Sequence, residues 1–199
     1  MNLYVVLYDL YMIFYMIFYV KLKAEFYNTE SDFDQNYKLL ISQQVLSHER
    51  QDSLRELLFK TRLMVKESTQ EGRLLILVFV DIVDLFEQTM ATHYDYQVIR
   101  NTFGKTESLK EFNKIILKLA EELENLSYYI ISNEKPIRLH DFKPQLEKLK
   151  LSIDQVEELG INGLVLKKIL INVRNMISRV EKIYSNFNQK KLFGQNDVD

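Results

Sequence analysis

The chain has 199 residues, which is enough for one sizeable hydrophobic core or two small ones. Its 26 Lys and Arg residues nearly balance its 28 Asp and Glu residues, which excludes the strongly basic surface of a nucleic-acid-binding protein. The absence of Cys excludes disulfides and thiolate chemistry. Only 5 Gly and 2 Pro are present, which favours helix along nearly the whole chain.

The first twenty residues are unusually apolar. Residues 3–20 are apolar or Tyr at every position except Asp9, and Lys21 and Lys23 follow. This length is at the lower limit for crossing a hydrocarbon core of about 30 Å, and the lysines would hold that end on the cytoplasmic side. Three interpretations stay open: a truncated or marginal membrane helix, a helix of a soluble core, and a mis-started or unnatural leader. Tyrosines with helical spacing fit all three: Tyr4, Tyr8, Tyr11, Tyr15 and Tyr19.

Helical spacing of apolar residues continues through the rest of the chain, without strand alternation of useful length. We therefore expect an all-α fold, an antiparallel bundle of five to six helices with a hydrophobic N-terminal helix. After that first helix, helices are expected over residues 32–67, 70–92, 94–103, 108–132, from 141 to a break at Gly160, and 164–187. The expected domains are a leader over 1–20, a soluble bundle over 21–188 and a flexible tail over 189–199.

Capping residues indicate where several of these helices begin and end. The expected N-terminal signals are Asp32, Asp141, and the capping boxes Ser68 with Glu71 and Ser108 with Glu111. Gly104 suits the end of the helix over 94–103. Residues 133–140 contain Pro136 and are expected to form a loop, while Pro144 is tolerated in a first helical turn.

Two carboxylates interrupt the most apolar helical segment. Residues 74–86 are dominated by apolar side chains and broken only by Asp81 and Asp84. Burying an unpaired charge costs several kcal/mol, so each carboxylate needs a partner. With Glu87 these acids share one side of the expected helix, and basic residues upstream supply candidate partners. The expected structural ion-pair layer comprises Arg55, Lys60, Arg62, Arg73, Asp81, Asp84 and Glu87.

The competing interpretation of these acids is a proton or substrate relay inside a membrane. Thirteen apolar-rich positions are too short to span one, so a structural role is favoured. The three histidines, His48, His93 and His140, lie in separate segments, and surface positions are favoured over metal binding for them. No phosphate-binding glycine loop or nucleophile motif is present. We therefore expect no enzyme activity, no cofactor and no metal site.

Four short strings carry a resemblance to a known family: residues 21–27, 55–62, 66–73 and 81–87. With them, the chain resembles the fusaric-acid-resistance-like (FUSC) inner-membrane proteins of the YccS/YhfK type. The resemblance is densest over residues 55–90 and weaker after about 135. It implies a bacterial inner-membrane protein with two membrane blocks separated by a soluble helical region, classed as an exporter of aromatic-acid-type compounds.

The chain departs from the family pattern because one marginal hydrophobic stretch precedes Lys21 and a second membrane block is missing. It therefore resembles the cytoplasmic segment plus the end of a membrane helix. The resemblance implies a structural or assembly role at the cytoplasmic face of the inner membrane. Its expected partners are the membrane blocks or other subunits, with membrane contact through residues 1–20 and no nucleic acid. The alternative is a free-standing helical bundle that binds a hydrophobic ligand or partner helix.

Overall fold

A computed structural model describes the backbone of residues 3–46, 49, 70–91, 94–132, 134 and 136–193. Within these ranges, the side chains of residues 3–12, 70–76, 79, 91, 130–131 and 188–193 are not described. All regular secondary structure in the described residues is helical, so the predicted all-α class is confirmed.

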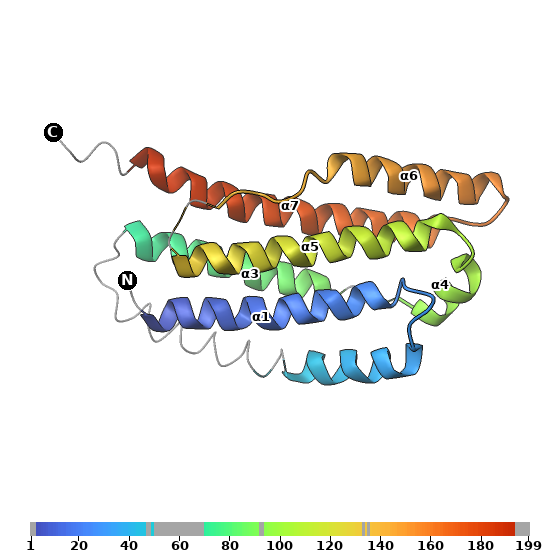
Figure 1. Ribbon diagram of the computed structural model, residues 1–199, viewed down its shortest axis with the longest axis horizontal. Helices are drawn as coiled ribbons and strands as arrows, with labels where there is room; N and C mark the ends of the chain where they lie inside the picture. Colours follow the sequence, from blue (N-terminus) through green and yellow to red (C-terminus); the bar gives the residue numbers. More distant parts are fainter. Residues whose placement is uncertain are drawn as a thin grey trace.

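Seven helical segments are present in the described part of the chain: the N-terminal helix and six others. They are α1 (Leu3–Glu25), residues 33–46, α3 (Gln70–Ala91), α4 (Tyr96–Phe103), α5 (Glu107–Ser132), α6 (Lys143–Glu158) and α7 (Leu164–Phe193). In Figure 1, α1, α3 and α6 run one way along the long axis, and α5 and α7 run the opposite way.

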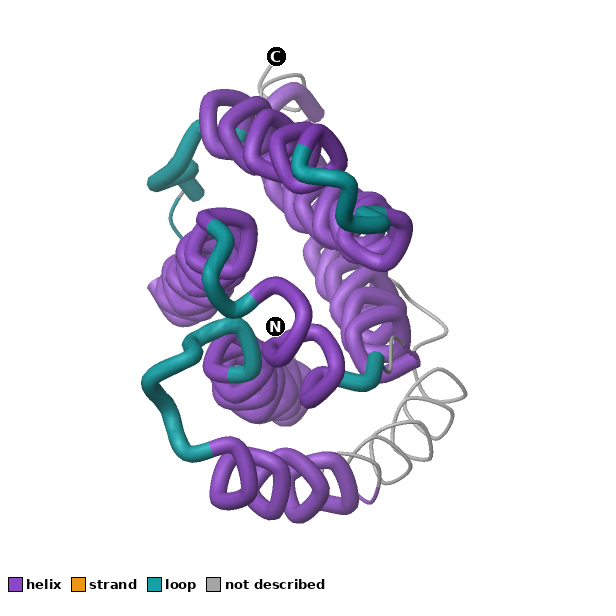
Figure 2. The backbone as a smooth tube through the Cα atoms, turned by 90° about the vertical axis from the view of Figure 1, so that its right-hand side faces the viewer, coloured by secondary structure: helices purple, strands orange, loops and turns teal. Residues whose placement is uncertain are grey.

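The packing of the bundle pairs helices that are distant in sequence. α1 packs chiefly on α5, and α3 packs chiefly on α7. The short helix α4 carries the chain from α3 to α5 at one end of the molecule (Figure 1). Figure 2 looks along the helices and shows residues 33–46 at one edge of the bundle, opposite the edge formed by α6 and α7.

The first helix is part of the main core. Met16 and Tyr19 are buried with Leu22 and Phe26, and all four belong to one hydrophobic cluster that includes residues of α3 to α7. The predicted domain boundary between residues 20 and 21 therefore falls inside a single helix, and residues on both sides of it enter the same core. Each large apolar side chain buried in this way contributes about 1.5–3 kcal/mol to folding.

Aromatic side chains fill the core where α1 ends and α4 begins. The rings of Phe26 and Tyr96 stack with centroids 4.5 Å apart, and those of Tyr27 and Phe112 stack at 5.3 Å. Offset ring contacts of this kind add to the gain from burial. This cluster joins the end of α1 to α4 and α5, which fixes how the chain turns at this end of the bundle.

The start of α5 differs from its prediction. The helix begins at Glu107, so Ser108 does not cap it. The Ser108 hydroxyl instead donates a hydrogen bond of 2.9 Å to the Ser152 carbonyl of α6. The Glu111 carboxylate accepts from Lys148 of α6 at 2.9 Å. The predicted capping box is therefore wrong, because both residues face another helix, which sequence spacing along α5 alone does not reveal.

Other predicted boundaries have mixed outcomes. Asp32 accepts a hydrogen bond of 2.9 Å from the amide of Gln35, as expected of an N-cap, and Gly104 follows the end of α4 as predicted. The N-cap position of α6 is Phe142 rather than Asp141. α7 continues to residue 193, so residues 189–193 of the predicted tail are helical.

Candidate functional site

The two acids singled out in the apolar segment lie on the side of α3 that faces α7. Asp81 is 2% exposed, and one carboxylate oxygen accepts from the Lys182 ammonium at 2.5 Å. The other oxygen accepts from the Asn186 amide at 2.7 Å. Lys182 and Asn186 are four residues apart, so they share one face of α7. The buried carboxylate is therefore both neutralised and hydrogen-bonded.

Asp84 lies one turn further along α3 and has a different partner. Arg179 donates to the Asp84 carboxylate at 3.0 Å and to the side-chain oxygen of Gln88 at 2.9 Å. The planar guanidinium suits such a two-point contact, because its donors form a rigid fork. Together the Asp81 and Asp84 contacts form a polar seam between α3 and α7.

Of the other residues predicted for the ion-pair layer, the structure describes the side chain of Glu87 alone. Arg55, Lys60 and Arg62 lie outside the described residues, as does the side chain of Arg73. Glu87 is exposed. Pairing of the α3 acids with Arg55, Lys60 or Arg62 therefore stays a prediction. The contacts of Asp81 and Asp84 with α7 were not part of that prediction.

The basic partners on α7 were not identified from the sequence. Arg179 and Lys182 are three residues apart, beside the apolar stripe of Ile177, Val180 and Tyr184. This spacing is a usable signal, because it places two basic groups on one edge of a helix that also has a buried face. It does not show which neighbouring helix supplies the acids.

A fully buried carboxylate anchors the connection from α5 to α6. We call residues 136–142, which run over the bundle without helical structure, the strap. Glu122 of α5 is 0% exposed and accepts from the backbone amides of Leu139 and His140 at 2.9 and 2.6 Å. It also accepts from the Tyr184 hydroxyl of α7 at 2.5 Å. Glu122 thus joins α5, the strap and α7 at one point.

The neighbours of Glu122 complete this anchor. Asn125 donates to the Ile137 carbonyl of the strap at 2.7 Å and to the Tyr184 oxygen at 2.8 Å. Burial, and after it the hydrogen bond to Glu122, raises the pKa of the Tyr184 hydroxyl well above its ordinary value. Tyr184 is therefore a hydrogen-bond donor at any physiological pH. His140 contacts Glu121 at 2.6 Å through Nε2.

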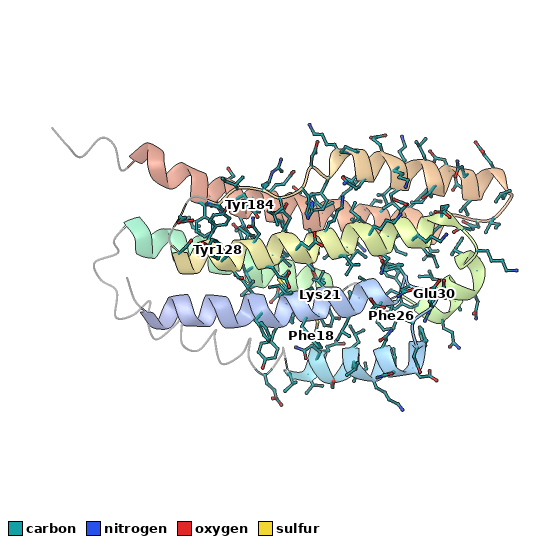
Figure 3. The ribbon with its side chains drawn as sticks, in the orientation of Figure 1. Phe18, Lys21, Phe26, Glu30, Tyr128 and Tyr184 are labelled. Atoms are coloured by element: carbon teal, nitrogen blue, oxygen red, sulfur yellow. The ribbon has the colours of Figure 1, made fainter. Side chains whose placement is uncertain are left out.

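The two lysines after the apolar stretch have different environments. Lys21 pairs with Glu124 of α5 (Figure 3). Lys23 is 7% exposed; it donates to the Thr89 carbonyl near the end of α3 and lies 5.5 Å from the centre of the Tyr19 ring. Burial lowers the pKa of the Lys23 ammonium to about 7. The membrane-helix interpretation of the leader placed Lys23 at the edge of a membrane; in the structure Lys23 lies inside the bundle, because it continues the buried stripe of α1.

An open cavity of about 510 Å³ lies between α4 and the turn before residues 33–46. Its lining comprises Glu30, Ser31, Asp32, Phe33, Asp34, Gln97, Arg100 and Asn101. Arg100 donates to the Ser31 carbonyl at 2.8 Å and also to the Asn28 carbonyl, which fastens α4 to this turn. We assign no ligand to the cavity, because Arg100 is already bound to the turn.

The geometry of these polar groups is that of helix-to-helix fastening. The carboxylates of Asp81, Asp84 and Glu122 each accept a hydrogen bond from a side chain of α7. Each carboxylate therefore links its own helix to α7. Among the described residues, no group of three His, Cys, Asp or Glu side chains is placed to hold a metal ion. A search of the same residues finds no helix long and apolar enough to cross a membrane.

Comparison with family models gives a match over residues 12–187 to the FUSC-like family, described as FUSC-like inner membrane protein yccS. The matched range runs from the middle of α1 into α7 and takes in the polar seam and the strap. Searches of curated proteins and of solved structures found no match. Because the matched residues make up well over half of the chain and form one packed core, the chain belongs to the FUSC-like family.

Proposed function

We propose that this chain is a helical domain at the cytoplasmic face of a FUSC-like bacterial inner-membrane exporter of aromatic-acid-type compounds. Its role is structural: it holds or assembles the membrane blocks or neighbouring subunits and performs no chemistry of its own. The observation that carries the proposal is the family match, which extends over the packed core from α1 to α7.

The surface of the bundle supports a position in water beside the membrane. Solvent-exposed ion pairs lie on α5, α6, α7 and the strap; they include Lys110–Glu107, Arg138–Glu181 and Lys167–Glu157. Charged side chains are costly in contact with hydrocarbon, so these helices suit an aqueous surface. Their ion pairs contribute little to stability there, and their presence marks the environment rather than strengthening the fold.

The polar interior supports a structural role. Asp81, Asp84 and Glu122 are used in contacts between helices, and such contacts fix the register of an apolar bundle. The alternative is a free-standing bundle that binds a hydrophobic ligand or partner helix, and the exposed aromatic residues Phe14 and Phe18 favour it.

Co-purification in detergent tests the proposal. The full chain is expressed in a bacterium with an affinity-tagged membrane part of a FUSC-like protein, and the membranes are dissolved before capture. We expect the chain to be captured with the tagged membrane part, and not with an unrelated tagged inner-membrane protein as the control. A chain that neither protein retains would contradict the proposal and favour the free-standing bundle.

A second measurement tests the side of the membrane. The chain is co-expressed with the same membrane part, and protease is added to intact spheroplasts and to lysed ones. A domain on the cytoplasmic face is protected until the cells are lysed. Digestion of the chain in intact spheroplasts would contradict the proposed location.

A further inference from the structure

Lysines are concentrated where the first half of α5 packs against α6. Residues 107–118 and 141–150 together contain six lysines and four acidic residues, although the whole chain has more acids than bases. The two helices are in direct contact. This part of the molecule therefore has an excess of positive charge on a chain whose net charge is −2.

A buried carboxylate lies at the centre of these lysines. The Glu111 side chain is 5% exposed, and one of its oxygens accepts from both the Lys114 and the Lys148 ammonium at 2.9 Å. Burial alone would raise the pKa of the Glu111 carboxyl, but the hydrogen bonds from the two lysines outweigh burial and lower it. Glu111 therefore stays ionised and holds an ammonium group of each helix close to the other.

The two ammonium groups also face solvent. The side chains of Lys114 and Lys148 are 57% and 64% exposed. An ammonium group has three N–H donors, and each of these two uses one of them on Glu111. The solvent side of the pair therefore offers further donors and positive charge to a second carboxylate, opposite Glu111.

Lys118 extends the cluster along α5. It lies against Gln145 of α6, whose side-chain oxygen accepts from the Lys118 ammonium at 2.5 Å. Lys118 is four residues after Lys114, and Gln145 is three residues before Lys148, so this contact is one turn along both helices. We call Lys114, Lys118 and Lys148 the basic row. Among the described residues, Glu111 is the only carboxylate that forms an ion pair with the row.

We propose that the basic row binds an acidic segment of a partner protein whose carboxylates are spaced about one helical turn apart. One carboxylate bridges Lys114 and Lys148 from the solvent side, and the next one along the segment pairs with Lys118. The proposal deepens the proposed function and rests on it, because a domain that holds other subunits needs a surface that recognises them.

The arrangement favours an extended acidic segment over a single small anion. Lys114 and Lys118 are separated by about 6 Å along α5, so a row of charges matches them better than one charge does. Lysine presents compact point charges, whereas arginine has the planar fork that grips a phosphate at two points. Because the expected ion pairs are exposed, binding should be moderate in strength and should weaken as salt screens it.

Binding of a short fluorescent poly-glutamate peptide to the purified full chain tests this proposal. Fluorescence anisotropy should show binding at low salt that is lost at high salt. Lys114→Gln with Lys118→Gln should weaken the binding about three- to thirtyfold, because two exposed ion pairs are lost. Lys148 is retained in this variant, so the buried Glu111 carboxylate keeps a partner. Circular dichroism melting checks that the variant is folded.

A matched control removes the same charge from other parts of the surface. Lys38 and Lys168 are exposed and lie in residues 33–46 and in α7, away from the α5–α6 junction. Lys38→Gln with Lys168→Gln gives the same net charge as the first variant and leaves the basic row intact. This control should bind poly-glutamate as the unaltered chain does.

Three results would overturn the proposal: no binding of poly-glutamate by the unaltered chain at low salt, equal loss of binding in the two variants, or a loss seen only with inorganic polyphosphate as the probe. The last result would assign the basic row to phosphate groups. Light scattering without peptide tests a second copy as the occupant, since a dimer that Lys114→Gln with Lys118→Gln dissociates would assign the row to self-association.

This experiment is independent of the test of the proposed function. Capture of the chain with the membrane part in detergent, without binding of poly-glutamate, would contradict the acidic partner alone. Binding of poly-glutamate to the basic row without that capture would contradict the proposed function alone.

Discussion

At the scale of single residues, the environment of each carboxylate determines how much it contributes to the stability of the fold. Asp81 and Asp84 look equivalent in the sequence, three positions apart in one apolar segment. In the structure, the Asp81 side chain is 3% exposed and that of Asp84 is 43% exposed. An exposed ion pair contributes about 0–1 kcal/mol, whereas loss of a buried hydrogen-bonded group costs about 1–3 kcal/mol.

Substitution of these acids should therefore have unequal effects. We expect Asp81→Ala to lower the free energy of unfolding by about 1–3 kcal/mol, because it leaves Lys182 and Asn186 without their acceptor. Asp84→Ala should cost less than this, but more than Glu147→Ala at an exposed position of α6. Urea unfolding of the three variants measures the order. Equal stability of all three would show that the polar seam does not stabilise the bundle.

The buried Lys23 is expected to make the stability of the bundle depend on pH. Its pKa in the folded protein is about 7, below the ordinary value of 10.5 that it has in the unfolded chain. Between these values the unfolded chain binds more protons than the folded one, so stability rises with pH. The slope reaches up to about 1.4 kcal/mol per pH unit.

The expected rise can be measured between pH 7 and 9, below the range where tyrosines ionise. Thermal melting or urea unfolding of the unaltered chain should show greater stability at pH 9 than at pH 7. Lys23→Met removes the titrating group and should flatten this dependence. A variant with the same rise as the unaltered chain would show that another group is responsible.

At the scale of elements, the strap is held by side chains rather than by regular backbone structure. Glu122 accepts two strap amides, and Asn125 donates to a strap carbonyl. These contacts replace the hydrogen bonds that a helix would make within itself. The strap therefore depends on one buried carboxylate, since hydrogen bonds to charged groups contribute about 1.5–3 kcal/mol.

Glu122→Gln should loosen the strap while the helices stay folded. The uncharged amide is a weaker acceptor, so we expect the amides of Leu139 and His140 to exchange with solvent roughly tenfold faster or more, from about 1.5–3 kcal/mol of lost interaction. Tyr184→Phe, which removes one of the donors to Glu122, serves as a comparison with a smaller effect. Hydrogen exchange measured by NMR reports both, and unchanged protection in Glu122→Gln would exclude Glu122 as the anchor.

Element type was more predictable than element boundaries. The apolar period placed a helix over residues 70–92, and α3 spans 70–91. The predicted caps of α5 and α6 were wrong. Ser108 contacts α6 instead of capping α5, and Phe142 rather than Asp141 holds the N-cap position of α6. A local pattern detects helical periodicity well, but a polar residue near a helix end can serve either a cap or a neighbouring helix.

At the scale of the whole molecule, α1 links the two main helix pairs, because it packs on α5 and also contacts α3, the partner of α7. It contacts α5 and α3, and its buried residues on both sides of position 20 belong to the common core. A bundle over residues 21–188 would lack most of α1, and it would expose the apolar surfaces that Met16 and Tyr19 cover. Each large buried apolar group contributes about 1.5–3 kcal/mol, so the several that residues 13–20 bury are together comparable with the total stability of a domain, about 5–15 kcal/mol.

Deletion of residues 1–20 should therefore abolish cooperative folding. We expect a chain that begins at Lys21 to show a broad, non-cooperative thermal transition and to bind a dye for exposed apolar surface. Circular dichroism of the deleted and full chains measures this directly. A sharp transition with the stability of the full chain would instead support residues 21–188 as an independent domain.

The sequence by itself determined the helical class, the ranges of several helices and the resemblance to the FUSC family. These depend on local periodicity and on short strings, which are readable along one dimension. Only the tertiary structure decided that Asp81 and Asp84 contact α7, that Glu122 anchors the strap and that Lys23 is buried. The physical reason is that helical spacing identifies which side chains share a face, whereas the partner of that face depends on how all the helices pack together.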